Sequence, residues 1–204
     1  LEARHYFHSR HRKAFLTGIA VASVLLAALL PSISPAAIRL YLILGGLVFG
    51  YFVVIHATEK AHRLPKEIAV GACFAAAVFI PTVAHDPELR ARLLPSGLLF
   101  AALCSLNCLF IYAWEHPSLN RPSLHTITRF AVIRLPSIGA AICLISAVMA
   151  VSGERSLWAI YLAISLAAGA LLFLHGRRSS HTALTLRTAA DLALLTPAVL
   201  LPFL

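Results

Sequence analysis

Charged residues are scarce in this chain. Only 12% of its 204 residues are Asp, Glu, Lys or Arg, whereas 60% are hydrophobic. Soluble globular domains carry about 25% charged residues, so this composition excludes a soluble domain. The apolar runs are continuous over about 20 residues instead of alternating with polar residues, and this pattern excludes a membrane β-barrel. The composition therefore predicts an all-α integral membrane protein.

The common motifs of catalysis and metal binding are missing as well. The chain has no glycine-rich phosphate loop, no nucleophile elbow, no haem-attachment motif and no His-Glu-x-x-His. Its four cysteines, Cys73, Cys104, Cys108 and Cys143, lie inside apolar runs without metal or disulfide spacing. We interpret them as small hydrophobic side chains in a reduced compartment.

Seven apolar segments are each close to the roughly 20 residues that cross about 30 Å of hydrocarbon. Prolines and glycines, among them Pro31, Pro65, Pro95 and Gly153, are interpreted as breaks between them. The connections are short, so we expect one polytopic transmembrane helical domain over residues 1–204. The segments are Ala14 to Pro31, Ala36 to Ala57, Ile68 to Ala84, Ser96 to Trp114, Phe130 to Val151, Ser156 to His175 and Ala183 to Leu204.

Basic residues are distributed unevenly between alternate loops. Thirteen of the 17 Lys and Arg residues fall on one side, and only Arg39, Arg90, Arg92 and Arg155 fall on the other. Cytoplasmic loops are enriched in Lys and Arg. We therefore expect an inner or plasma membrane protein with the basic loops and the N-terminal segment in the cytoplasm and the C-terminus outside. The net charge of +9 then indicates loops that face anionic lipid, and not a nucleic-acid partner.

The end of the fourth apolar segment is the main candidate site. Glu115 and His116 follow Trp114 there, and they are either ordinary interfacial groups or a place where a divalent cation or a diphosphate docks. Asn107 lies about two turns further in, where an amide most often bonds a neighbouring helix; a substrate contact is the less favoured alternative.

Two further features carry charge near the same membrane surface. The loop from His56 to Glu67 contains Lys60, Arg63 and Lys66, which either follow the positive-inside rule or neutralise a phosphate. Asp191 lies inside the last apolar segment, four residues after Arg187. It either pairs with that arginine on one helix face or faces a cavity.

These features resemble the UbiA-type family of intramembrane prenyltransferases. Members have nine membrane helices and two aspartate-rich motifs on cytoplasmic loops. The seven segments resemble helices three to nine, which implies that two N-terminal helices precede Leu1. The stretch Arg63-Leu-Pro-Lys-Glu-Ile-Ala-Val-Gly71 is similar to the family's basic loop, and Thr126 resembles the threonine that follows the second motif. Glu115 then takes the first acidic position of that motif, while Leu119, with Asn120 beside it, takes the next.

The resemblance implies transfer of a polyprenyl group from its diphosphate to a lipid-soluble aromatic acceptor. Glu115 and Asn120 would hold Mg²⁺, and Arg63, Lys66 and Arg121 would bind the diphosphate, with Asn107 lining the cavity. We expect Glu115, Arg63 and Lys66 to line one cytoplasmic pocket. Because the second motif is degenerate, the alternative is a non-catalytic membrane or lipid-binding subunit on the same bundle.

Overall fold

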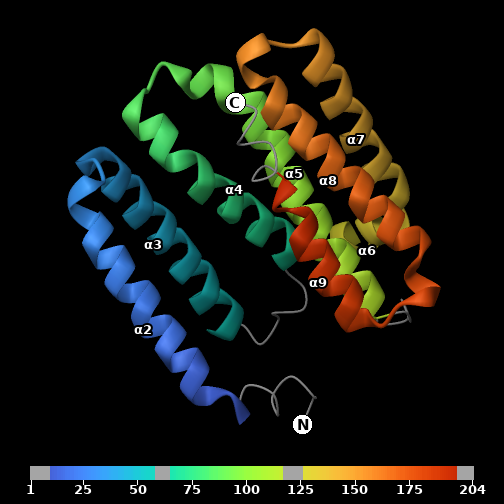
Figure 1. The fold of residues 1–204 in the computed structure, drawn as a ribbon, viewed down its shortest axis with the longest axis horizontal. Helices are drawn as coiled ribbons and strands as arrows, with labels where there is room; N and C mark the ends of the chain where they lie inside the picture. The colour runs from blue at the N-terminus through green and yellow to red at the C-terminus, as the bar shows by residue number, and fades with distance from the viewer. Residues whose placement is uncertain (1–9, 58–64, 117–125, 197–204) are drawn as a thin grey trace.

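The structure, a computed structural model, describes residues 10–57, 65–116 and 126–196. Within these ranges the chain forms eight α-helices, which run up and down beside one another (Figure 1). Helix α5 packs against α4, α6, α7, α8 and α9, so it is the central element of the bundle. The helices are α2 (Arg12–Leu29), α3 (Pro35–Ala57), α4 (Lys66–His85), α5 (Leu89–Glu115), α6 (Thr126–Ile133), α7 (Leu135–Ser152), α8 (Trp158–Gly176) and α9 (Ala183–Ala193).

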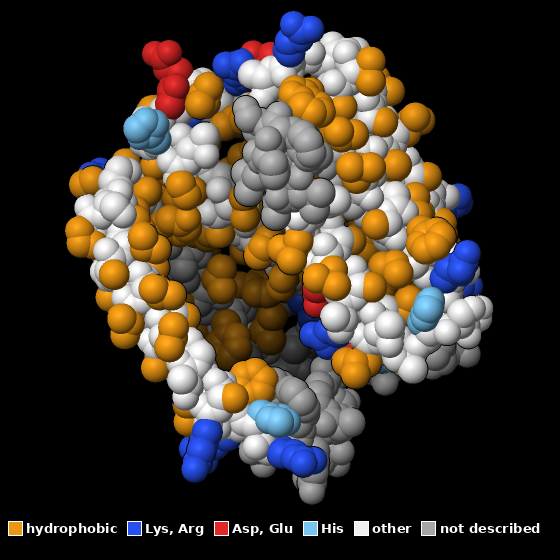
Figure 2. All heavy atoms as spheres, viewed as in Figure 1, with side chains coloured by type: hydrophobic (Ala, Val, Ile, Leu, Met, Phe, Trp, Pro, Cys, Tyr) orange, Lys and Arg blue, Asp and Glu red, His pale blue; other side chains and the backbone are white. Residues whose placement is uncertain are grey.

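Six helical segments are long and apolar enough to cross a membrane. Their outer faces carry large hydrophobic side chains, such as Val151 with an exposed fraction of 91% and Leu42 with 71%. Hydrophobic side chains also cover much of the face shown in Figure 2. These lengths and surfaces are those of an integral membrane protein. The segments are Arg12–Ser32, Pro35–Ile55, Lys66–His85, Leu89–Glu115, Leu135–Ser152 and Arg155–Gly176.

Several predicted boundaries were wrong. The fifth segment is divided, because α6 ends at Ile133 and α7 begins at Leu135. The fourth helix begins at Leu89, so Pro95 lies inside it and is not a break. For the seventh segment the structure gives only α9, an 11-residue helix, and residues 197–204 lie outside the described ranges. The seventh span is therefore not confirmed.

Helix α5 continues through Pro95, and helix α4 continues through Pro81, where a side chain from another helix bonds the carbonyl that the proline leaves free. Proline has no N–H, so Pro81 leaves the carbonyl of Ala77 without its helical donor. The hydroxyl of Tyr41 in α3 donates to that carbonyl at 3.0 Å. Membrane helices tolerate proline when such groups satisfy the freed backbone.

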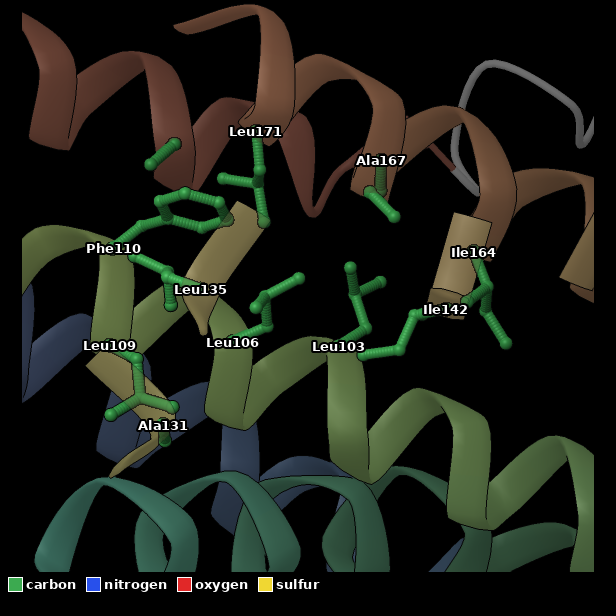
Figure 3. Packing of buried hydrophobic residues seen from close by; sticks show 12 residues of the cluster. Leu103, Leu106, Leu109, Phe110, Ala131, Leu135, Ile142, Ile164, Ala167 and Leu171 are labelled. Atoms are coloured by element: carbon green, nitrogen blue, oxygen red, sulfur yellow. The ribbon is translucent and has the colours of Figure 1, made fainter. Parts of the chain in front are cut away.

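The main core is a layer of apolar side chains around α5. Figure 3 shows Leu103, Leu106 and Phe110 of α5 pointing towards α8, from which Ala167 and Leu171 point back. All five side chains are at least 98% buried. The half of α5 that ends at Glu115 is therefore held rigidly, and it positions the polar groups at this end of the bundle.

A second close contact joins α4 to α5. Gly71 faces Ser105, and a Cβ atom on Gly71 would lie only 2.7 Å from the Cα atom of Ser105. Only glycine allows the two backbones to approach this closely. Glu67 lies one turn before Gly71 on the same buried face of α4, so this contact also brings its carboxylate against the bundle.

We expect Tyr41→Phe to lower the free energy of unfolding by about 1 kcal/mol, because the carbonyl of Ala77 loses its only substitute donor. In a Pro81→Ala background, residue 81 regains an N–H and the same substitution should cost less. Unfolding in mixed micelles would measure all four variants. An equal loss in both backgrounds would show that the hydroxyl does not compensate for the proline.

Gly71→Ala should destabilise the bundle by about 1–3 kcal/mol, the usual cost of overpacking. Gly97→Ala in α5 is the matched control, since a Cβ atom there meets nothing within 4 Å. Thermal unfolding in detergent would compare the two variants. Similar midpoints for both would contradict the proposed close approach of α4 and α5.

Candidate functional site

Two polar pairs join the end of α5 to α9. The guanidinium of Arg187 donates to Glu115 with an Nη1 to Oε1 distance of 3.2 Å. Deeper in the bundle, the amide Nδ2 of Asn107 donates to Oδ1 of Asp191 at 3.3 Å. Helices α5 and α9 run in opposite directions. Arg187, near the start of α9, therefore contacts Glu115 at the end of α5. Asp191, one turn later on α9, contacts Asn107, about two turns before Glu115. We call these four residues the α5–α9 polar pairs.

The α5–α9 polar pairs differ in their surroundings. Asn107 is buried with an exposed fraction of 4%, whereas Asp191 is exposed at the surface of the protein. The Oδ1 atom of Asn107 is also buried and has no hydrogen-bond partner among the described residues. A buried acceptor without a partner is costly, so this amide is the point in the pairs where an additional donor would be most favourable.

Glu67 is a third acidic group near this end, and sequence reasoning assigned it no role. Its side chain is buried, with an exposed fraction of 7%, and it accepts a hydrogen bond from the hydroxyl of Thr128 in α6 at 3.5 Å. The only available signal was its spacing of four residues from Gly71, which places both on one helix face. The bond to Thr128 connects α4 to α6 across the end of α5.

Cys108 follows Asn107 on α5. It is within electrostatic range of Glu67 from α4 and of Asp191 and Arg187 from α9. These groups therefore form one polar layer that crosses the bundle near the ends of α5 and α8 and the starts of α4 and α9. The layer contains both positively and negatively charged side chains, so it can contact a charged group of a ligand of either sign.

Apolar space lies next to this layer. Figure 2 shows a hollow beside α9, with a hydrophobic floor and with acidic and basic side chains on one wall. A cavity of about 220 Å³ lies further from the layer, between the second half of α4, the middle of α5 and the first half of α8, with Phe79, Phe100 and Ile160 among its lining residues. A second groove of about 470 Å³ lies between α3 and α4. Such spaces fit hydrocarbon chains and not polar substrates.

The predicted site residues have different outcomes. Asn107 makes the interhelical bond that we expected, and Glu115 and Lys66 lie at the same end of the antiparallel neighbours α5 and α4. Lys66 is exposed. Arg63, Asn120 and Arg121 lie outside the described residues, so the pocket expected to contain Glu115, Arg63 and Lys66 stays a prediction. The local pairing considered for Arg187 and Asp191 is replaced by the α5–α9 polar pairs.

The described residues do not by themselves fit a resident Mg²⁺ ion. No group of three or more His, Cys, Asp or Glu side chains that could hold a metal lies within them. Glu115, the described member of the predicted pair of ligands, has its carboxylate bound by Arg187. Magnesium sites usually take one or two carboxylates together with substrate phosphates, and here the one described carboxylate of the predicted pair is bound by an arginine.

Comparison with known proteins found no match to this chain. No protein-family model matches the chain, and no curated protein or solved structure matches it. The resemblance to UbiA-type proteins therefore stays a prediction, and the chemistry of the site is argued from its own geometry.

A double-mutant cycle on Asn107→Ala and Asp191→Ala tests the deeper of the α5–α9 polar pairs. Interhelical hydrogen bonds in membrane proteins have a mean coupling energy of about 0.6 kcal/mol and a maximum near 1.7 kcal/mol. We expect a coupling in this range, measured by unfolding in bicelles. A matched cycle on the solvent-exposed pair Glu115 and Arg187 should give a smaller value that falls with added salt. Strictly additive losses for Asn107 and Asp191 would contradict the bond.

Proposed function

We propose that this integral membrane protein binds a polyprenyl diphosphate, with the isoprenoid chain in the apolar hollow and the diphosphate at the polar layer. The observation that carries the proposal is the hollow itself, which has a hydrophobic floor and charged side chains on its wall (Figure 2). An isoprenoid diphosphate has the same division into a long apolar part and a compact, strongly charged part. Among lipids of this kind, the resemblance to the UbiA-type family favours an isoprenoid diphosphate.

The proposed orientation follows from the charges. Lys66, Arg129, Arg177 and Arg187 lie at the end of the bundle where α4 and α9 begin and α8 ends. By the positive-inside rule, this end faces the cytoplasm of an inner or plasma membrane, and the C-terminus lies outside. A diphosphate made in the cytoplasm would then reach the polar layer directly.

The proposed reaction is transfer of the polyprenyl group to a lipid-soluble aromatic acceptor, as in the UbiA-type family. A bond forms between the acceptor and the first carbon of the prenyl chain, the bond from that carbon to the diphosphate oxygen breaks, and the acceptor loses a proton. Negative charge develops on the leaving diphosphate, where cationic side chains lower the barrier. Lys66, which is exposed, would supply one such charge, and Arg63 and Arg121 stay predicted contributors. Mg²⁺ also stays a prediction.

A second candidate is a non-catalytic lipid-binding subunit. The ion pair between Glu115 and Arg187 favours this candidate. Glu115 is the only acid at the expected positions of the second motif, and its carboxylate already contacts an arginine. Leu119 stands where a second acid is expected. In this case the lipid would bind in the same hollow without being consumed.

Binding would be measured with tritiated geranylgeranyl diphosphate on the full chain in nanodiscs. We expect Lys66→Gln to weaken binding about tenfold, because a charge-assisted hydrogen bond contributes about 1.5–3 kcal/mol. Arg39→Gln removes an exposed charge at the opposite end of the bundle and should have no effect. Equal binding of geranylgeraniol would show that the diphosphate is not recognised, and no saturable binding would refute the proposal.

Turnover separates the two candidates. The full chain would be incubated with the same diphosphate, a panel of phenolic and quinone acceptors, and Mg²⁺. Product formation that Glu115→Gln abolishes supports the enzyme and its metal role, whereas unchanged formation would exclude that role. Binding without product for every acceptor supports the lipid-binding subunit.

A further inference from the structure

A separate pocket of about 450 Å³ lies at the same end of the bundle, between the ends of α5 and α8 and the start of α9. Its nitrogen-bearing lining residues are Trp114, His116, His175, Arg178 and His181. Among the residues that the structure describes, no Asp or Glu lines it, and neither do Lys66, Asn107 or Arg187. We call it the histidine pocket. Its lining is rich in donors and carries positive charge, which favours an anionic ligand.

The hydrogen bond from Trp114 fixes the tautomer of His175. The indole Nε1–H is a donor only, and it lies 3.1 Å from Nδ1 of His175. Nδ1 must therefore accept, which leaves the ring proton on Nε2. The ring is also held by Phe110, with a centroid distance of 5.1 Å. His175 thus provides a preorganised N–H donor whose position does not depend on a ligand.

Arg178 is anchored beside this donor. Its Nη1 atom donates to the backbone carbonyl of His175 at 3.1 Å, which holds the guanidinium at the end of α8. The neighbouring Arg177 is used differently, because its guanidinium lies 5.0 Å from the ring centroid of Phe173. Only Arg178 lines the histidine pocket. A guanidinium retains several other N–H groups after one bond, and its fork matches two oxygens of a phosphate.

The acidic residue nearest in sequence does not cancel this charge. Glu115 lies between Trp114 and His116, but its carboxylate is bound by Arg187. The start of α9, where Ala183 and Leu186 line the pocket, adds the partial positive charge of a helix N-terminus. Val132 and Leu186 form an apolar part of the lining next to these donors.

We propose that the histidine pocket binds a phosphate group, with Arg178 and the Nε2–H of His175 as its principal contacts. Basic pockets between membrane helices at the lipid–water boundary commonly bind phosphorylated lipid head groups. The same donors would accept free phosphate. The apolar part of the lining would contact the glycerol and first methylenes of a lipid. This site lies apart from Lys66, so it does not depend on the polyprenyl diphosphate proposal.

The fluorescence of Trp114 gives a direct test, because the chain has two tryptophans and Trp158→Phe leaves Trp114 as the only reporter. The full chain in phosphatidylcholine nanodiscs would be titrated with dioctanoyl phosphatidic acid and, separately, with inorganic phosphate at constant ionic strength. We expect saturable changes with phosphatidic acid and none with added dioctanoyl phosphatidylcholine. Saturation by inorganic phosphate as well would identify free phosphate as a ligand, and saturation by the lipid alone would identify a head group.

Matched variants separate the site from general surface charge. Arg178→Gln should raise the dissociation constant about tenfold or more, because it removes charge-assisted bonds. Arg177→Gln should leave it within about twofold, because Arg177 does not line the pocket. His175→Leu should weaken binding, whereas His175→Gln keeps an N–H near the Nε2 position and should restore most of it. Equal effects of Arg177→Gln and Arg178→Gln, or no saturable signal with either ligand, would overturn the proposal.

Discussion

The structure depends on one constraint of the membrane interior, which is that polar groups must find partners within the protein. Tyr41 meets this requirement for a carbonyl that Pro81 leaves free, and Asn107 meets it for Asp191. Both partners lie on other helices, so each local defect in a helix becomes a connection between helices. Apolar packing places α5 in the centre of the bundle, and polar bonds join it to α9.

The class of fold could be predicted because hydrocarbon thickness sets the length of an apolar span. Helix boundaries were less predictable at prolines that a membrane helix tolerates. Pro95 was read as a break, since proline removes a helical hydrogen bond, but α5 continues through it. The division at Arg134 was missed because residues 130–151 were interpreted as one apolar run, although Pro136 in the first turn of α7 is typical of a helix start.

The location of the polar chemistry could also be predicted, whereas its pairing could not. Basic and acidic residues were expected at one membrane surface, and Glu115, Asp191 and Arg187 do lie near one end of the bundle. Their partners are 72 and 84 residues apart in sequence, so no local spacing reveals them. Spacing of four residues suggested that Arg187 pairs with Asp191, but α9 turns both groups to α5. Glu67 follows a basic loop in the sequence, so its burial was not predicted. That burial accompanies the close approach of α4 to α5 at Gly71, which no local pattern in the sequence reveals.

The last turn of α5 has contacts on two sides. Trp114 contacts His175 in the histidine pocket, and the next residue, Glu115, contacts Arg187 beside the hollow. A ligand that shifted this turn on one side would change the geometry on the other, and by thermodynamic reciprocity the influence would be equal in both directions. Adjacent residues in one turn can thus link the lipid surface around the protein to the occupancy of its interior.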